Sequence, residues 1–378
     1  MIKIIKNIDK KLLIYSLILF AFGLVMIYSA SNVTAYMVNE ASPGRYFFKQ
    51  LVFIIIGFIG ALILLRFSTK KYSSMSWLAT LGLGAAILCL VIYGTATNGA
   101  YNWIGYKGFG IQPSEFSKVF IIPLLATYYE KYENDNDNWK KMLLPLGLVL
   151  VITFLIISQN DYGTALIFLI LSLIVFFMAP VSKKIKKSVF FVGLGAFILL
   201  LLAIVIGGDK IIPKEKLERF NYSNPCERYI TTGNQLCNGY IAINGGGLFG
   251  KGLGNSTQKY LYLAESHTDF IFAIIIEELG VAGGILLFAL YALLLLRIVV
   301  IGKRCLKRSH SIICYGVAIY LFLHIFINVG GVLGIIPITG IPLAFMSYGG
   351  SFCWCTIIAL TFVQRICYET KKKNKELV

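Results

Sequence analysis

Residues 12–29 read LLIYSLILFAFGLVMIYS, an uncharged run that directly follows the basic pair Lys10 and Lys11. A helix needs about 20 mostly apolar residues to cross the hydrocarbon core of a bilayer. Runs of this kind recur to the end of the chain, with polar and basic residues between them. The sequence therefore predicts a polytopic helical membrane protein.

The composition supports this fold class. Of 378 residues, 57% are hydrophobic and 14% are charged, and the mean hydropathy is +0.76, whereas soluble domains carry about 25% charged residues. One water-soluble core could not bury so much apolar side chain, which excludes a soluble enzyme and a disordered scaffold. An outer-membrane barrel is excluded as well, because its strands would alternate apolar and polar residues.

Ten membrane-spanning helices are expected, in an all-α fold that forms a single integral membrane domain over 1–378. The fourth span is the weakest, because it starts in a polar segment and carries Lys118. A large extracytoplasmic loop, about 207–267, separates the seventh span from the eighth, and a basic cytoplasmic tail covers about 367–378. The expected spans are 12–29, 47–65, 77–94, 115–129, 142–158, 164–180, 188–206, 269–296, 312–335 and 343–366.

The net charge of +17 follows this topology. Most Lys and Arg residues lie near the two termini and in alternate loops, such as 183–187 and 303–308. Because these residues mark the cytoplasmic side of a membrane, both termini are predicted to be cytoplasmic. The topology accounts for most of the excess of Lys and Arg, so no nucleic-acid partner is expected. The expected partner around the helices is membrane lipid.

Two of the eight cysteines, Cys226 and Cys237, share the extracytoplasmic loop, where a disulfide is chemically permitted. The sequence leaves open whether that bridge forms. The other six are expected to be small apolar filler.

A polar segment opens the fourth span. Pro113 suits the first turn of a helix, and Glu115 and Lys118 are three residues apart, so they share one helix face. Two interpretations are open, a self-neutralising pair near the interface and a charged pair that faces an outer cavity. The second is favoured, because charges within an apolar span usually serve function. Trp103, just before this segment, would by itself be an interfacial anchor.

Other polar segments lie in the expected outer loops. Asp161 is expected to cap the helix that starts near Thr164. The glycine-rich segment 242–259 is not a Walker A loop, because it lacks Gly-Lys-Ser/Thr. It could present backbone N–H groups to a phosphate, or it could be a flexible lid.

Asp269 lies where the long loop re-enters the membrane, next to Phe270 and Phe272. An apolar setting raises a carboxyl pKa unless a cation pairs with it, which suits a general base or acid; the alternative is an acid at a helix start. Glu277 and Glu278 are expected to make structural contacts between helices. A zinc site near His267 is not expected without further ligands.

Glycine and proline are dense between Asn328 and Ser351. They are expected to break the helices there. Broken backbone at membrane depth is tolerated where it is buried in protein or lines a cavity, and small residues also allow tight helix packing.

Taken in order, these motifs resemble the SEDS family of shape, elongation, division and sporulation proteins, which includes RodA, FtsW and SpoVE. The resemblance covers about 98–352, and segments 252–256 and 277–280 look more like the FtsW and SpoVE branch. The matching stretches are Trp103-Ile104, Gln112-Pro113-Ser114-Glu115 with Lys118, Asp161-x-Gly163-Thr164-Ala165, Gly246-Gly247-x-x-Gly250-x-Gly252, Gln258, His267-Thr268-Asp269-Phe270-Ile271-Phe272-Ala273, Glu277-Glu278-x-Gly280, and Pro337-x-Thr339-Gly340 through Ser347-Tyr348-Gly349-Gly350-Ser351.

The chain departs from the family pattern at five positions. Asn102 stands where Arg is usual, which removes a phosphate or carboxylate partner and bears on substrate affinity more than on chemistry. Asn160, Ala264 and Ala344 stand where Pro is usual, which suggests looser loops. Phe352 stands where Ser or Thr is usual.

The resemblance implies a peptidoglycan glycosyltransferase that polymerises lipid II at the outer face of the cytoplasmic membrane of a bacterium. Asp269 matches the family's essential acid and is the candidate base for the acceptor hydroxyl, in one inverting displacement with undecaprenyl diphosphate as the leaving group. Lys118 would pair with Asp269 or Glu115. The implied partners are a class B penicillin-binding protein (a transpeptidase) and divisome or elongasome proteins. Division, elongation and sporulation remain open as roles.

The remaining site residues are expected on the same basis. Lys251, Lys259, Arg219 or Arg228 would hold the diphosphate, and a divalent cation, Mg²⁺ or Mn²⁺ on Asp269 or Glu115, is an open alternative. No organic cofactor is expected. The other expected substrate contacts are Trp103, Gln112, Gln258, His267, Ser347 and Tyr348.

Two other functions fit the residues less well. A lipid II flippase would need polar groups along the whole path, whereas the intramembrane charges here gather near the expected outer face. A non-catalytic scaffold that activates the transpeptidase is disfavoured by the intact Asp269, Glu115 and Lys118.

Overall fold

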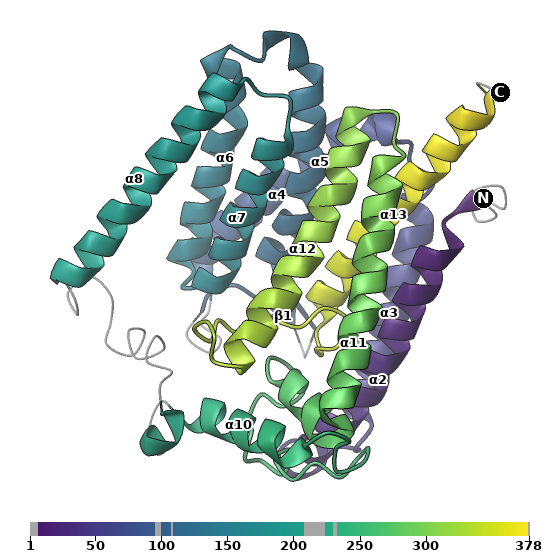
Figure 1. The fold of residues 1–378 in the computed structure, drawn as a ribbon, viewed down its shortest axis with the longest axis vertical. Coiled ribbons are helices and arrows are strands. Elements are labelled where there is room, and N and C mark those ends of the chain that lie inside the picture. Colours follow the sequence, from purple (N-terminus) through teal and green to yellow (C-terminus); the bar gives the residue numbers. More distant parts are fainter. Residues whose placement is uncertain (1–6, 95–99, 107–108, 208–223, 230–232, 377–378) are drawn as a thin grey trace.

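The computed structural model describes residues 7–94, 100–106, 109–207, 224–229 and 233–376. Within these residues, ten helices have at least 17 residues, and all of them pack in a bundle except the one at Lys183–Gly207, which leans away to one side (Figure 1). They are α2 Lys10–Met37, α3 Arg45–Leu64, α4 Tyr72–Tyr93, α5 Pro113–Lys131, α6 Trp139–Ser158, α7 Tyr162–Met178, α8 Lys183–Gly207, α11 Ile271–Lys303, α12 Arg308–Val332 and α13 Gly350–Glu376. The predicted all-α membrane fold is confirmed.

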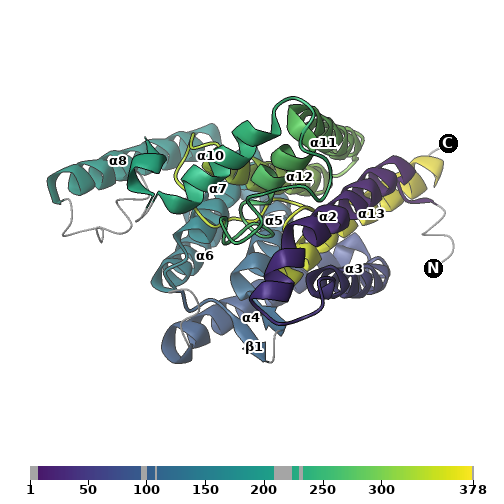
Figure 2. The same ribbon diagram turned by 90° about the horizontal axis from the view of Figure 1, so that it is seen from below.

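Seven helices in the described part of the chain are long and apolar enough to cross a membrane, and α7 is a shorter apolar helix. The weak span predicted from the sequence is α5, and its position explains its polarity. It packs against α4, α7, α12 and α13 at the centre of the bundle, and its polar first turns are buried (Figure 2). Because protein surrounds them, these side chains do not face lipid.

Side chains near the helix ends satisfy backbone N–H groups that the helices leave free. Asp161 accepts a hydrogen bond from Thr164 N at 3.1 Å and caps α7, which confirms that prediction. Asp9 caps α2, and its carboxylate also pairs with Arg297 of α11 at 2.5 Å. Both termini lie at this end of the bundle, together with the basic α11–α12 turn (Figure 1).

The structure corrects the start of the last predicted span and adds detail to two other predicted segments. The expected extracytoplasmic loop contains the helix α10 (Asn234–Gly246). The last helix begins at Gly350 rather than near 343, because 333–349 is irregular, as expected for its density of glycine and proline. The basic tail continues α13 to Glu376, since Lys and Glu are good helix formers.

One element was not anticipated, the hairpin of β1 (Ile104–Tyr106) and β2 (Phe109–Ile111), which is antiparallel.

The predicted span 269–296 is also not one continuous helix, because α11 breaks at Gly280. Gly280 has φ 69° and ψ −176°, a region that essentially only glycine adopts. The glycine-rich segment fills the break: Lys251 N donates to Glu277 O and Gly252 N to Glu278 O, each at 2.9 Å. On the other side of the break, Val281 N donates to Gly247 O at 3.0 Å.

Replacing Gly280 with alanine should destabilise the protein strongly. A Cβ at this position would lie 2.3 Å from the carbonyl oxygen of Leu248 and 2.4 Å from Gly250 N. With the cost of the φ value added, we expect a loss of about 3 kcal/mol or more, measured by thermal unfolding in detergent. Gly147→Ala is the matched control, because its Cβ meets nothing within 4 Å in α6; equal midpoints for both variants would contradict the analysis.

Candidate active site

The carboxylate of Asp269 lies in the turn that leads into α11. It is partly exposed and lines a pocket with Asn328, Thr339 and Gly340 among others. In the described residues its carboxylate oxygens have no hydrogen-bond or ion-pair partner, whereas its backbone carbonyl accepts from Asn328 Nδ2 at 2.8 Å. Burial, and to a smaller extent the charge of Glu265, raises the pKa of Asp269 to about 7. The expected raised pKa of a base is therefore present.

The irregular segment 333–349 braces the turn before Asp269. Ser347 Oγ donates to Thr268 O at 2.7 Å and accepts from Leu343 N at 2.7 Å. Tyr348 N donates to His267 O at 2.9 Å. The structure thus brings three predicted site residues, His267, Ser347 and Tyr348, to the turn that carries Asp269.

The His267 ring packs against two tyrosine rings, with centroids 4.6 Å from Tyr46 and 5.9 Å from Tyr348. Its Nδ1 is buried and has no hydrogen-bond partner in the described residues. Burial lowers the pKa of His267. The His267 side chain is therefore an uncharged ring that packs beside the turn. Its Nδ1 remains without a partner among the described residues.

Glu115 and Lys118 form the predicted pair, with Lys118 Nζ 2.6 Å from Glu115 Oε1. The pair does not face an outer cavity, because both side chains are buried, with exposed fractions of 4% and 0%. Lys118 contacts Glu115 and His324 (Nζ to Nε2, 3.2 Å) and, in the described residues, not Asp269. The preference for a cavity-facing pair was wrong, since protein encloses α5 on several sides.

Sequence reasoning missed His324. Its only signal was its spacing of four residues before Asn328, which places both side chains on one face of a helix. That spacing could not show which elements the face meets.

Asp161 does more than cap α7. Its Oδ2 accepts from Gln112 Nε2 and from Asn102 Nδ2, each at 2.7 Å. The amide of Gln112, a predicted substrate contact, is therefore engaged within the protein. Trp103 is 40% exposed and packs over Gly110 of β2, so it remains available at the surface.

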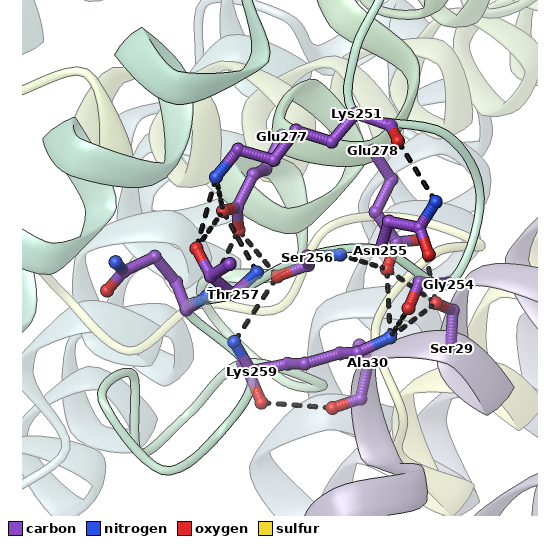
Figure 3. Close-up of polar contacts among 12 residues, drawn as sticks. Ser29, Ala30, Lys251, Gly254, Asn255, Ser256, Thr257, Lys259, Glu277 and Glu278 are labelled. Atoms are coloured by element: carbon purple, nitrogen blue, oxygen red, sulfur yellow. Dashed lines mark hydrogen bonds and ion pairs between the residues drawn. The ribbon is translucent and has the colours of Figure 1, made fainter.

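The glycine-rich segment is held by two ion pairs at the end of the first part of α11 (Figure 3). Lys251 Nζ lies 2.6 Å from Glu277 Oε1, and Lys259 Nζ lies 3.2 Å from Glu278 Oε1. Ser29 Oγ of α2 also donates to Glu278 Oε1 at 2.6 Å. Glu278 makes the expected structural contact between helices, to Ser29 of α2, whereas Glu277 contacts the glycine-rich segment instead.

Further polar contacts complete this cluster. Glu277 accepts from Thr257 N at 3.1 Å and from Gln258 N at 3.3 Å, while Lys259 Nζ donates to Gly254 O at 2.6 Å. Gln258 is buried, and its Oε1 has no partner in the described chain. The segment is therefore a braced structure rather than the flexible lid considered from the sequence.

One remaining expected contact, Arg228, lies in a short segment that is linked to α10. Cys226 and Cys237 form a disulfide, which links the short 3-10 helix Pro225–Arg228 to α10. Arg228 ends this 3-10 helix and is partly exposed. Arg219 lies outside the described residues.

The two carboxylates suggested for a metal, Asp269 and Glu115, differ in their surroundings. Glu115 is engaged with buried Lys118, and no group of three His, Cys, Asp or Glu suited to a metal occurs in the residues searched, which are the described ones. A divalent cation here would need oxygen ligands from a bound substrate, as Mg²⁺ commonly takes from phosphates.

Comparisons with known proteins were consistent with one another. The family model for FtsW, RodA and SpoVE, described as "Cell cycle protein", matches residues 10–372. The "Probable peptidoglycan glycosyltransferase FtsW" of Bacillus subtilis (strain 168) is 35% identical over 99% of this chain and 95% of its own length. "Stage V sporulation protein E" of the same organism is 35% identical over 93% of this chain and 94% of its length.

Solved structures show the same fold. A chain from a study of how a peptidoglycan synthase complex coordinates polymerization and crosslinking aligns with a TM-score of 0.77 and 23% identity, covering 96% of this chain and 98% of that one. Rod shape determining protein RodA of Thermus thermophilus aligns with a TM-score of 0.68 and 24% identity, covering 95% and 96%.

Breaking the buried Lys259–Glu278 pair should destabilise the protein. Lys259→Met leaves Glu278 buried without its cation, which should cost about 3 kcal/mol, read from thermal unfolding in detergent. Lys259→Met with Glu278→Gln should recover part of that loss, because neither position then carries an unpaired buried charge. Lys141→Met is the control, since the Lys141–Asp135 pair is exposed and its midpoint should not move; a drop equal to that of Lys259→Met would refute the cluster's role.

Proposed function

This chain belongs to the family of FtsW, RodA and SpoVE, and we propose that it polymerises lipid II with Asp269 as the general base. It is a peptidoglycan glycosyltransferase, as its relatives at 32–35% identity over nearly the whole chain are named. The observation that carries the proposed mechanism is the partly exposed Asp269 carboxylate, which lines a pocket and has no partner in the described residues.

In the proposed reaction, Asp269 takes the proton of the acceptor sugar hydroxyl. The freed oxygen attacks the anomeric carbon of the donor, and the bond from that carbon to the lipid diphosphate breaks. A pKa of about 7 suits this step, because a base is most effective when its pKa lies near the working pH. One displacement inverts an α-linked donor to a β-linked product and needs no covalent enzyme intermediate.

The surrounding residues would hold Asp269 rather than react. Ser347 and Tyr348 hold the backbone just before it, and Asn328 holds its own carbonyl oxygen. The Glu115–Lys118 pair is buried at the centre of the bundle, so we assign it a positioning role. Such preorganisation matters because a small displacement of a reacting group is costly in rate.

Lys251 is the proposed contact of the leaving diphosphate among the lysines considered. Its side chain is 33% exposed, whereas that of Lys259 is 1% exposed. A phosphate could therefore reach Lys251 while Glu277 keeps its contacts to Thr257 and Gln258. We propose that Mg²⁺ or Mn²⁺, where one takes part, arrives bound to the diphosphate. The proton transfer to Asp269 and the displacement at the anomeric carbon do not depend on it.

The chain is a multi-pass membrane protein. We propose that it lies in the cytoplasmic membrane with both termini inside, because the termini share one end of the bundle with basic turns (Figure 1). The likeness to a chain of a peptidoglycan synthase complex supports a class B penicillin-binding protein as the partner. Divisome or elongasome proteins would then surround the pair.

Asp269→Asn should abolish polymerisation without unfolding the protein. The assay uses purified protein with its class B penicillin-binding protein, labelled lipid II, divalent cations and penicillin to block crosslinking. Loss of the base should reduce glycan formation by about 100-fold or more. Asp135→Asn, at an exposed acid, is the control. Ladders from the Asp269 variant would remove it as the base, and no ladder from a folded wild-type complex would favour a flippase or scaffold.

The pH dependence should report the same carboxylate. Asp269 must be deprotonated to act, so kcat/KM should fall as the pH drops through about 7. Glu265→Gln removes a like charge and should lower the pKa of Asp269, which shifts the acidic limb to lower pH. An acidic limb that does not move in this variant would count against Asp269 as the titrating base.

A further inference from the structure

His324 is a fully buried residue of α12 that bridges two parts of the protein. Its Nε2 lies 3.2 Å from Lys118 Nζ, and its Nδ1 lies 3.4 Å from the carbonyl oxygen of Pro342. A carbonyl oxygen only accepts, so Nδ1 carries the proton and Nε2 offers its lone pair to the ammonium group. The neutral imidazole thus joins the ion pair on α5 to the irregular segment 333–349.

Two rings fix the plane of this imidazole. Phe352 stacks on it, with centroids 4.5 Å apart and an interplanar angle of 29°. Tyr320 packs edge-on at 4.9 Å and 65°. Phe352 is a position where the family pattern has Ser or Thr, so this departure supplies the stacking partner. The imidazole cannot rotate out of this plane without losing its contacts with Phe352 and Tyr320. These contacts keep Nε2 directed at Lys118.

Asn328 lies one turn further along the same face of α12. Its Nδ2 donates to Ile341 O at 2.7 Å and to Asp269 O at 2.8 Å. His324 and Asn328 therefore hold neighbouring carbonyls of one segment, those of Pro342 and Ile341. Asn328 then links that segment to the backbone of Asp269.

We propose that His324 is a positioning residue for glycosyl transfer, which ties the Glu115–Lys118 pair to the segment 333–349 and so holds the backbone of Asp269. This inference rests on the proposed function, because Asp269 is the base there. Lys118 then needs no direct contact with Asp269 to affect it. The Glu115–Lys118 pair acts through His324 and the carbonyls of Pro342 and Ile341.

The competing account is that His324 only fills space, and three substitutions separate the two. His324→Gln keeps one donor and one acceptor with enough reach to contact both Lys118 Nζ and Pro342 O. His324→Asn carries the same amide but is one methylene shorter, so it cannot span both. His324→Leu keeps similar volume and removes both contacts. His310→Gln, elsewhere on α12, is the control.

The four variants and wild type are compared in the lipid II assay with the partner transpeptidase, alongside thermal unfolding. We expect His324→Gln to keep kcat within about threefold, and His324→Asn and His324→Leu to lose at least about tenfold in kcat with KM little changed. Equal kcat for the Gln and Leu variants, or an equal loss in all three, would overturn the proposal. Where the Leu variant does not fold, the ratio of Gln to Asn decides.

A failure of the proposed function can be distinguished from a failure of the proposal for His324. If wild type makes no glycan, the lipid II polymerase proposal fails, and a double-mutant cycle of His324→Gln, His324→Asn and Lys118→Met in thermal unfolding tests the bridge by itself. A coupling of Lys118 to the Gln side chain that vanishes for Asn supports it. No coupling in either background overturns it.

Discussion

A bilayer offers no hydrogen-bond partners, so every backbone group that leaves helical geometry inside this bundle must find one within the protein. Among the described residues of the bundle, Gly280 in α11 and the segment 333–349 leave helical geometry. The glycine-rich segment supplies the partners at the first place, and Asn328 and Ser347 supply them at the second. The proposed base, Asp269, lies in the turn before α11, and the second of these segments contacts that turn through Ser347 and Tyr348.

Charges follow the same constraint. A buried ion is costly unless it is paired and hydrogen-bonded, and each buried lysine of the bundle faces a carboxylate: Lys118 faces Glu115, and Lys259 faces Glu278. Asp269 differs, because its carboxylate has no partner among the described residues. A side chain left unpaired where others are paired is available for chemistry. Burial, with a smaller contribution from the charge of Glu265, raises its pKa, and no cation among the described residues offsets this.

Much of this could be predicted from the sequence, because the relevant signals are local. Long apolar runs placed the helices, a spacing of three placed Glu115 beside Lys118, and Asp161 preceded its helix as a cap does. The remainder depends on contacts between distant segments. Nothing near Lys259 in the sequence indicates Glu278 and Ser29 as its partners. In the same way, the break at Gly280 is visible only once the segment that fills it is in place.

The position of Asn102 in the structure shows which partner a residue at this site contacts. The usual Arg there could have served a phosphate or a carboxylate. Asn102 donates to Asp161, the carboxylate that also caps α7 and accepts from Gln112 at the start of α5. A residue at this position therefore braces the junction of α5 and α7, and Asn supplies one N–H where an Arg would offer a two-pronged contact. The buried Oδ1 of Asn102 has no partner in the described chain. The contacts that hold the backbone of Asp269 come from other segments, through Asn328 and Ser347.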